Sequence, residues 1–384
     1  MKFDFYLGIN ATCFSARPSG AKNRFIGFFS YIFKKLNNIH FTVYMSAEYD
    51  LRADFVTYQN VTFISTPLLS ENSAQRFFVG LFYWRKELKK NSFHIFESFH
   101  LPLITNPFGK TLLTIHDIRH LRNRSAFQTI KYLIHKHAVS KSDFVITVSE
   151  TMKHEIKQIF PNTKISVIYN GQNYLNNSQD ENFDYRCLNK HNITQPFIMA
   201  VGHFEARKNY LNLLKAIKLY HKKYSIKLSL VMIGNDNGHL SKIKSEIHEL
   251  DLNENIRILS GIGDQELFSL YSSAQLFIFP STYEGFGIPI LESFNAMCPI
   301  ITSNIEVFKE ITEGELIYFD PYSIEDIVKK MHKVLNSDSI SERIVNYGKM
   351  RKNDFEYKFL VNKYINIYHD LLGYKNETPT SKLK

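Results

Sequence analysis

Cysteine is scarce in this 384-residue chain, and long uncharged apolar runs are missing. The three cysteines, Cys13, Cys187 and Cys298, form no metal-binding spacing, and any disulfide pairing would leave one of them over. Reduced thiols in a cytoplasmic protein are the simplest interpretation. No apolar stretch approaches the ~18 residues that a membrane span needs. Asp4 interrupts the first apolar run, which argues against a signal peptide.

Several motifs that bind nucleotides are also missing. Asp-x-Asp, the usual carboxylate pair that holds a diphosphate through a metal ion, occurs nowhere in the chain. Ser19-Gly20-Ala21 precedes a predicted helix, so backbone N–H groups around Gly20 are candidates for phosphate contacts. This segment lacks both the glycine spacing of a dinucleotide fingerprint and the Gly-Lys-Ser/Thr of a P-loop. Neither nicotinamide nor ATP is therefore predicted, and cationic side chains and helix N-termini would have to neutralise any diphosphate.

Composition and charge favour a soluble two-domain protein with one basic half. Hydrophobic residues make up 44% of the chain and charged residues 22%, as in ordinary globular proteins. The segment through Gln172 holds 22 basic and 11 acidic residues, whereas the remainder holds 25 and 26. The basic half is a candidate for contact with a membrane surface, a lipid-linked phosphate or nucleic acid. Lysines on merely solvated faces are the alternative.

One aromatic segment has two interpretations. Phe77–Lys90 contains the only tryptophan and ends in basic residues. It fits a helix at a membrane interface. A core helix whose basic end is solvated fits slightly better.

Apolar runs alternate with helical patterns along the whole chain, which predicts parallel sheets covered on both faces. The predicted domains are residues 1–172 and 196–353, joined by a polar linker at 173–195, with a closing helix at 354–373 and a flexible tail at 374–384. Their cleft is the expected ligand site. The predicted helices include Phe25–Leu36, Tyr210–Tyr220, Ser323–Leu335 and Phe355–Leu372. The predicted strands are Met1–Ile9, Phe41–Met45, Val61–Ser65, Phe93–Glu97, Thr111–Ile115, Phe144–Val148, Phe197–Val201, Lys227–Ile233, Ile256–Leu259, Leu276–Phe279 and Ile300–Ile301.

The stretch Pro280–Glu292 concentrates chemistry at the end of a strand. The apolar run Leu276–Phe279 leads into a loop with two glycines, and Pro289 suits the start of the helix that follows. The loop carries Glu284, and the first helical turn carries Glu292. Bare backbone between these carboxylates lets helical N–H groups meet an anion. A ligand with hydroxyls and phosphate is indicated.

Two further segments follow predicted strands. Arg207-Lys208 comes after Phe197–Val201 and before a helix, where adjacent cations suit a phosphate or diphosphate at the same sheet edge as Glu284. His116 follows Thr111–Ile115 in the first domain. It is either a histidine satisfied at a strand end or a group that hydrogen-bonds a sugar or accepts a proton.

These segments, taken in order, resemble the GT-B glycosyltransferases of family 4 (glycosyltransferase group 1), a large retaining group that includes mannosyltransferases. The Glu-x7-Glu pattern is present as Glu284 and Glu292. Flanking segments that also match are Asp264-Gln265-Glu266-Leu267 with Leu270-Tyr271, Tyr318-Phe319-Asp320-Pro321, Val148-Ser149-Glu150 and Tyr169-Asn170-Gly171. The resemblance covers most of the second domain and little of the first.

The resemblance implies a role for each matching residue. Glu284 would hold the hydroxyls of the donor sugar, Glu292 the ribose, and Lys208 a phosphate. The family often has an arginine where this chain has His203, and Arg207 would supply that charge. His116 would face the donor sugar, and Ile262 would lie in the loop where the base docks. Backbone amides near the sugar would come from Gly285, Phe286, Gly287 and Ile288.

The resemblance further implies a retaining, metal-independent hexosyltransferase with a nucleotide diphosphate sugar, GDP-mannose or a UDP-sugar, as donor and no cofactor. The acceptor would be a glycan or a polyprenyl- or lipid-linked sugar in bacterial surface polysaccharide synthesis. The location would be cytoplasmic, peripheral at the inner face of the membrane. A sugar-nucleotide epimerase and a glycan phosphorylase are alternatives on the same scaffold. A basic nucleic-acid-binding protein is the non-enzyme alternative, but no zinc spacing or RNA-binding motif supports it.

Overall fold

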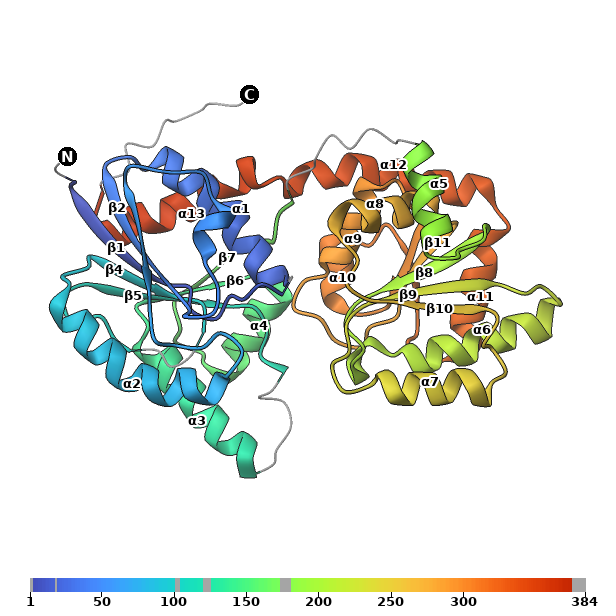
Figure 1. Cartoon of the computed structure of the whole chain (residues 1–384), viewed down its shortest axis with the longest axis horizontal. Helices are drawn as coiled ribbons and strands as arrows, with labels where there is room; N and C mark the ends of the chain where they lie inside the picture. Colours follow the sequence, from blue (N-terminus) through green and yellow to red (C-terminus); the bar gives the residue numbers. More distant parts are fainter. Residues whose placement is uncertain (1–2, 18, 101–103, 120–125, 173–180, 375–384) are drawn as a thin grey trace. The chain divides into compact units, whose positions relative to one another are not determined.

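The computed structural model of the chain describes residues 3–17, 19–100, 104–119, 126–172 and 181–374. The chain divides into two compact units (Figure 1). Unit 1 comprises Met1–Asn173 and Glu356–Lys384, and unit 2 comprises Tyr174–Phe355. Each is built on one parallel sheet with helices on both faces. The predicted fold class, two Rossmann-like parallel-sheet domains, is confirmed.

Unit 1 contains a seven-stranded sheet in the order β3-β2-β1-β4-β5-β6-β7. All its strand pairs are parallel, with Asn10 at the end of β1 opposite Ser98 at the end of β4. Its elements are β1 (Phe5–Asn10), α1 (Gly20–Lys35), β2 (Ile39–Met45), the 3-10 helix η1 (Leu51–Asp54), β3 (Val61–Ser65), α2 (Ser73–Lys90), β4 (Ile95–Ser98), β5 (Lys110–Ile115), α3 (Ala126–Lys141), β6 (Phe144–Thr147), α4 (Glu150–Ile159), β7 (Ile165–Val167) and α13 (Tyr357–Leu372).

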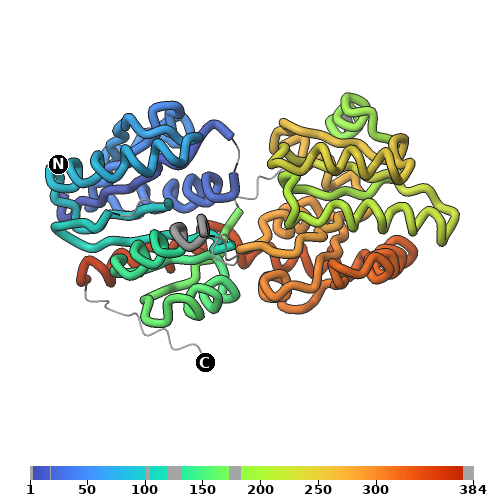
Figure 2. Tube along the Cα trace, turned by 90° about the horizontal axis from the view of Figure 1, so that it is seen from below, coloured from blue at the N-terminus to red at the C-terminus, as the bar shows by residue number. Residues whose placement is uncertain are grey.

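The last helix of the chain belongs to the core of unit 1. Figures 1 and 2 show the red helix α13 among the blue and green elements, and it packs beside α1, where the Tyr357 ring lies 4.9 Å from that of Phe28. Tyr364 and Tyr368 donate hydrogen bonds to the buried carboxylate of Glu97 on β4. Burial raises the pKa of Glu97 to about 7 in spite of these donors. The predicted closing helix therefore completes the first domain's core.

Unit 2 contains a six-stranded parallel sheet in the order β10-β9-β8-β11-β12-β13. Figure 1 shows α6 and α7 on one side of this sheet and α8 and α9 on the other. Its elements are α5 (Glu181–Lys190), β8 (Phe197–Val201), the 3-10 helix η3 (Ala206–Lys208), α6 (Tyr210–Tyr224), β9 (Ser229–Ile233), α7 (Leu240–Glu249), β10 (Ile256–Leu259), α8 (Asp264–Ser273), β11 (Leu276–Phe279), α9 (Ile288–Asn295), β12 (Ile300–Ser303), α10 (Glu306–Ile311), β13 (Ile317–Phe319), α11 (Ile324–Leu335), α12 (Asp338–Arg351) and the 3-10 helix η4 (Lys352–Phe355).

The largest differences from the predicted elements are at β7, β13 and α5. Strands β7 and β13 were not predicted, because each has three residues and is held at a sheet edge by one neighbour. The interpretation of 181–195 as linker is wrong for α5. Cys187 and Leu188 are buried in the structure, but most of their neighbours in the sequence are polar, so the helical pattern of apolar residues is hard to detect. The rest of that linker up to residue 180, and the tail from residue 375, lie outside the described residues.

The observed helices also bear on two predictions from the sequence. Helix α1 starts at Gly20, earlier than predicted, because the Ser19 hydroxyl accepts a hydrogen bond from the backbone N–H of Lys22 at 3.2 Å. Gly20 is therefore the first helical residue. In the described part of the chain no helix combines the length and apolarity that a membrane crossing requires.

Candidate functional site

The candidate site in unit 2 lies where the strand order reverses. Strands β8 and β11 are neighbours in the sheet, although β9 and β10 intervene in the chain. Loops that leave two such strands diverge to opposite faces, and the space outside their carboxyl ends is the usual ligand site of an open parallel sheet. The loop after β8 carries Arg207 and Lys208, and the loop after β11 carries Glu284.

The backbone of the first loop places Lys208 inside the protein. Gly202 has φ of +143°, and a Cβ there would lie 2.7 Å from the Lys208 side chain. The Tyr210 hydroxyl donates to the carbonyl of Gly202 at 2.8 Å. Asn209 takes the left-handed conformation, and its amide donates to the carbonyl of Pro321 at 2.7 Å. The lysine stem therefore runs back along the end of β8 and is buried.

Glu284 is the centre of a cluster of opposite charges. Its Oε1 lies 2.5 Å from Arg207 Nη1 and 2.7 Å from Lys208 Nζ. The Ser281 hydroxyl donates to the same oxygen at 2.9 Å. Arg207 Nη2 also reaches Oε1 of Glu205 at 2.6 Å. Two cations and two carboxylates are thus held together at the sheet edge.

The two loops are also joined by hydrogen bonds to backbone carbonyls. The N–H of Thr282 donates to the carbonyl of Arg207 at 2.8 Å, and Arg207 Nη1 donates to the carbonyl of Tyr283 at 3.0 Å. This pairing fixes the cations relative to Glu284, so the cluster is rigid before any ligand binds.

Charge interactions outweigh burial at Glu284. Burial by itself would raise the pKa of this carboxyl, but Lys208 and then Arg207 lower it below its ordinary value. For Arg207, burial is opposed by Glu284 and Glu205, and the net pKa is raised. Glu284 and Arg207 are therefore ionised near neutral pH. Burial lowers the pKa of Lys208, and the charge of Glu284 opposes that shift.

Helix α9 begins directly after the Glu284 loop. Gly287 precedes it with φ of +126°, a conformation that favours glycine, and no side chain caps the first turn. Pro289 lies in that turn, as predicted. Phe286 is buried, whereas Gly285 and Ile288 are half-buried. The start of α9 thus offers backbone donors and the positive end of a helix dipole beside the two cations.

Glu292 lies one turn further along α9 and has a different environment. The Tyr271 hydroxyl of α8 donates to its Oε2 at 3.0 Å. Burial raises the pKa of Glu292 to about 7, Asp264 contributes in the same direction, and the Tyr271 hydrogen bond and Lys208 oppose the shift. The two carboxylates of the Glu-x7-Glu pattern therefore differ in charge state near neutral pH.

The other predicted site residues lie at the rim of unit 2 or in unit 1. His203 is exposed beside the cluster, and burial of its ring and then Lys208 lower its pKa. Ile262 is half-buried in the loop between β10 and α8. Gly20, at the start of α1, is in unit 1.

His116 follows β5 in unit 1. Its ring is half-buried, and its Nε2 has no hydrogen-bond partner in the part of the chain that the structure describes. Burial and then the charge of Arg24 lower the pKa of His116 to about 3. The imidazole is therefore neutral near pH 7, suited to exchanging hydrogen bonds with a sugar and poorly suited to accepting a proton.

Three contacts of the site were not predicted. Glu205 orients Arg207, Ser281 donates to Glu284, and Tyr271 donates to Glu292. Glu205 and Ser281 lie in the same short segments as Arg207 and Glu284. This closeness in the sequence was the one feature that could have indicated their contacts. Tyr271 is 21 positions from its partner, so no local pattern links the two.

Comparison with known proteins identifies the family of the chain. Residues 185–351 match the family model of glycosyl transferases group 1, and residues 37–173 match that of Glycosyltransferase Family 4. The O-antigen chain mannosyltransferase RfbU of Salmonella typhimurium is 28% identical over 266 residues, which cover 67% of this chain and 68% of that one. The O-antigen chain mannosyltransferase B of Escherichia coli is 26% identical over 284 residues, or 71% of this chain and 72% of that one.

The fold has solved counterparts as well. The structure of HepE of Anabaena with UDP and glucose superimposes with a TM-score of 0.74 at 13% identity, over 96% of this chain and 100% of that one. This likeness shows the fold, and the family models show the class of enzyme. The chain is a glycosyltransferase of the GT-B fold, with a family 4 domain followed by a group 1 domain.

Proposed function

We propose that the enzyme transfers a hexose, with mannose favoured, from a nucleotide diphosphate sugar to a glycan or lipid-linked acceptor during synthesis of a bacterial surface polysaccharide. The donor is GDP-mannose or a UDP-sugar. The names of the two O-antigen mannosyltransferases support the sugar and the pathway. The capsular polysaccharide glycosyltransferase CapM of Staphylococcus aureus, 26% identical over 281 residues, supports the wider class of acceptor.

The observation that carries this proposal is the ion-paired cluster of Arg207, Lys208 and Glu284. Negative charge grows on the diphosphate as the sugar departs, and cations fixed beforehand stabilise it without reorganising. Lys208 Nζ and Arg207 Nη1 lie within 2.7 Å of one carboxylate oxygen, so they already share an anion position. These two cations and the start of α9 supply the positive charge that a metal ion would otherwise provide.

Glu284 positions the sugar in this mechanism. Its Oε1 is held by two cations and the Ser281 hydroxyl, which makes it a weak nucleophile. Its second oxygen is the acceptor for sugar hydroxyls. We infer that a leaving phosphate oxygen takes the proton of the acceptor hydroxyl on the same face, so the anomeric configuration is retained.

The proposal is tested by incubating the enzyme with GDP-, UDP- and ADP-sugars and a lipid-linked acceptor, without added Mg²⁺ or Mn²⁺. We expect one donor to be consumed, with mannose transferred and the anomeric configuration retained by NMR of the product. Donor turnover without acceptor would indicate an epimerase. Inversion at the anomeric carbon, or activity only with added metal, would contradict the mechanism.

Replacing Glu292 is expected to weaken nucleotide binding and to reduce its pH dependence. The pKa of Glu292 is about 7, above its ordinary value, so the carboxylate that accepts ribose hydroxyls forms only as pH rises through 7. Affinity of the native enzyme for the nucleoside diphosphate should rise about tenfold from pH 6 to pH 8. Calorimetry of native enzyme and Glu292→Gln measures this. The nucleotide's own phosphate titrates in both experiments, so the two proteins are compared. An equal change of affinity with pH in native enzyme and Glu292→Gln would contradict the proposed role of Glu292.

We also propose that α2 attaches unit 1 to an anionic membrane surface. Trp84 is buried, so that part of the predicted interfacial segment is core. Phe78 and Phe82, four residues apart, are 65% and 76% exposed. Lys86 and Lys89 are exposed further along the helix. Two aromatic rings followed by cations on one stripe of a helix suit a headgroup layer.

The double variant Phe78→Ser/Phe82→Ser is expected to bind anionic vesicles about tenfold or more weakly. The reason is that the variant loses the two aromatic rings whose transfer from water into the lipid favours binding. Sedimentation with phosphatidylglycerol vesicles measures this. Phe359→Ser on α13 is the matched control, since Phe359 is also exposed in unit 1. Equal loss in both proteins, or equal binding to neutral vesicles, would contradict attachment through α2.

A further inference from the structure

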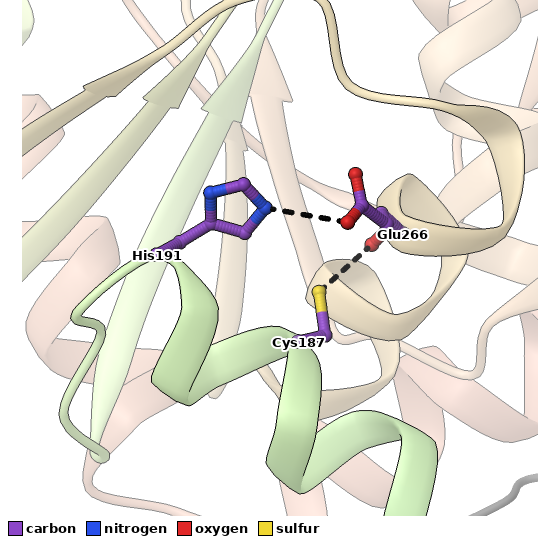
Figure 3. A group of neighbouring side chains, drawn as sticks. All are labelled: Cys187, His191 and Glu266. Atoms are coloured by element: carbon purple, nitrogen blue, oxygen red, sulfur yellow. Dashed lines mark hydrogen bonds and ion pairs between the residues drawn. The ribbon is translucent and has the colours of Figure 1, made fainter.

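Three side chains with different donor atoms meet where α5 packs on α8 (Figure 3). Cys187 lies on the last turn of α5, His191 directly follows that helix, and Glu266 lies on the first turn of α8. The thiol sulfur, a ring nitrogen and a carboxylate oxygen all lie within 4.8 Å of one another. Figure 3 shows the cysteine and histidine turned toward the glutamate. None of the three has a role in the donor site.

The spacing in the chain is typical of two ligands on one helical face. Cys187 and His191 are four residues apart, so their side chains lie one turn apart on the same side. The spacing between the cysteines gave no sign of this, because only one cysteine takes part. Glu266 is 79 residues from Cys187 and is brought close by the packing of α5 against α8.

The nitrogen and sulfur donors make weaker contacts with the protein than the Glu266 carboxylate, which pairs with Lys190. His191 Nε2 is buried and has no hydrogen-bond partner among the described residues. Its distance to Glu266 Oε1 is 3.6 Å, which is long for a hydrogen bond. The buried Cys187 thiol lies 3.9 Å from the backbone carbonyl of Glu266, a long contact, and also interacts with the Ser269 side chain. A buried ring nitrogen left in this state is unfavourable, and a cation between the three groups would satisfy it.

We propose that Cys187, His191 and Glu266 bind one Zn²⁺ ion, with water as the fourth ligand, and that this ion fastens α5 to α8. Sulfur, imidazole nitrogen and carboxylate oxygen together form a donor set that favours zinc. Ligand atoms around tetrahedral zinc are about 3.5 Å apart, as follows from bonds of about 2.0–2.3 Å. Closing the site needs side-chain movements of about 1 Å. The thiol gives its proton to solvent as the Zn–S bond forms.

Lys190 is the competitor for this ion. Its Nζ lies 2.5 Å from Glu266 Oε1, and its side chain is 63% exposed. The ammonium neutralises the carboxylate when zinc is absent and can turn into solvent when zinc binds. Removing this lysine is therefore expected to tighten zinc binding, which a simple ion-pair cluster would not do.

The proposal is tested with the full chain, first freed of metal by a chelator and then titrated with Co²⁺ and Zn²⁺. We expect one ion per chain, a thiolate-to-cobalt charge-transfer band, and a higher melting temperature with zinc. Cys187→Ser should abolish the band, and His191→Ala should lower zinc affinity about tenfold or more. Lys190→Gln should raise the affinity. Cys13→Ser, which removes a half-buried thiol in unit 1, should keep the band.

Three results would overturn the proposal: no charge-transfer band in the native chain, a band that persists in Cys187→Ser, or zinc affinity unchanged in His191→Ala. If Cys187→Ser fails to fold, the His191→Ala and Lys190→Gln titrations still decide the matter through their opposite shifts. All readouts are absorption and melting. The outcome is therefore independent of whether the proposed sugar transfer is correct.

Discussion

Replacing Lys208 with alanine is expected to lower kcat by about 10²–10³-fold, the loss typical of removing one fixed donor to a developing negative charge. Lys208 is buried and its ammonium lies 2.7 Å from Glu284. The fold should be affected far less, because Glu284 keeps its contacts with Arg207 and Ser281. Steady-state kinetics with the identified donor and thermal melting measure the two effects.

The matched control for this variant is Lys222→Ala, since Lys222 is exposed at the end of α6. It should leave both turnover and melting unchanged. Unchanged turnover in Lys208→Ala together with a lower melting temperature would mean that the lysine is structural and that the phosphate assignment is wrong.

Replacing Glu284 with glutamine is expected to lower both activity and stability. The amide keeps the shape but removes the negative charge that compensates two cations. Breaking a buried ion pair in this way costs about 3–5 kcal/mol of unfolding free energy. Pyrophosphate should then restore the melting temperature of Glu284→Gln, because the uncompensated cations attract an anion. Thermal melting with and without millimolar pyrophosphate measures this.

Glu306→Gln provides the control, because Glu306 is an exposed carboxylate paired with Lys309 on α10. Its melting temperature should match that of the native enzyme. If pyrophosphate protected native enzyme and Glu284→Gln equally, Arg207 and Lys208 would not form the diphosphate site. Glu284 compensates part of the cationic charge in the native enzyme, so removing its charge should increase the protection by pyrophosphate.

Much of the fold could be predicted because buried parallel strands are continuous apolar runs. Val61–Ser65, Phe197–Val201 and Ile256–Leu259 have the bounds that their apolar runs predicted. Helix α5 could not be predicted in this way, because it has few apolar residues and their burial against α8 is evident only in the structure. The edge strands β7 and β13 are likewise too short to show a period and are held by their neighbours.

The location of Arg207, Lys208 and Glu284 was predictable from the sequence, whereas most of their contacts were not. A strand followed by a loop and a helix was enough to place Arg207, Lys208 and Glu284 at one sheet edge, and the structure brings them within ion-pair distance. The contributions of Glu205 and Tyr271 were not predictable, because a side chain's partner across two loops depends on the order of strands in the sheet. Arg207, and not His203, pairs with Glu284 in this arrangement.

The sequence by itself determined the class of fold, the family and the Glu-x7-Glu motif formed by Glu284 and Glu292. These depend on residue types at short spacings. Only the tertiary structure decided how those residues are charged and which distant groups meet them. Glu97 meets Tyr364 and Tyr368 more than 260 positions away, and Glu266 meets Cys187 and His191. The physical reason is that periodicity reports a residue's nearest turns, whereas burial and charge depend on which elements the sheet places side by side.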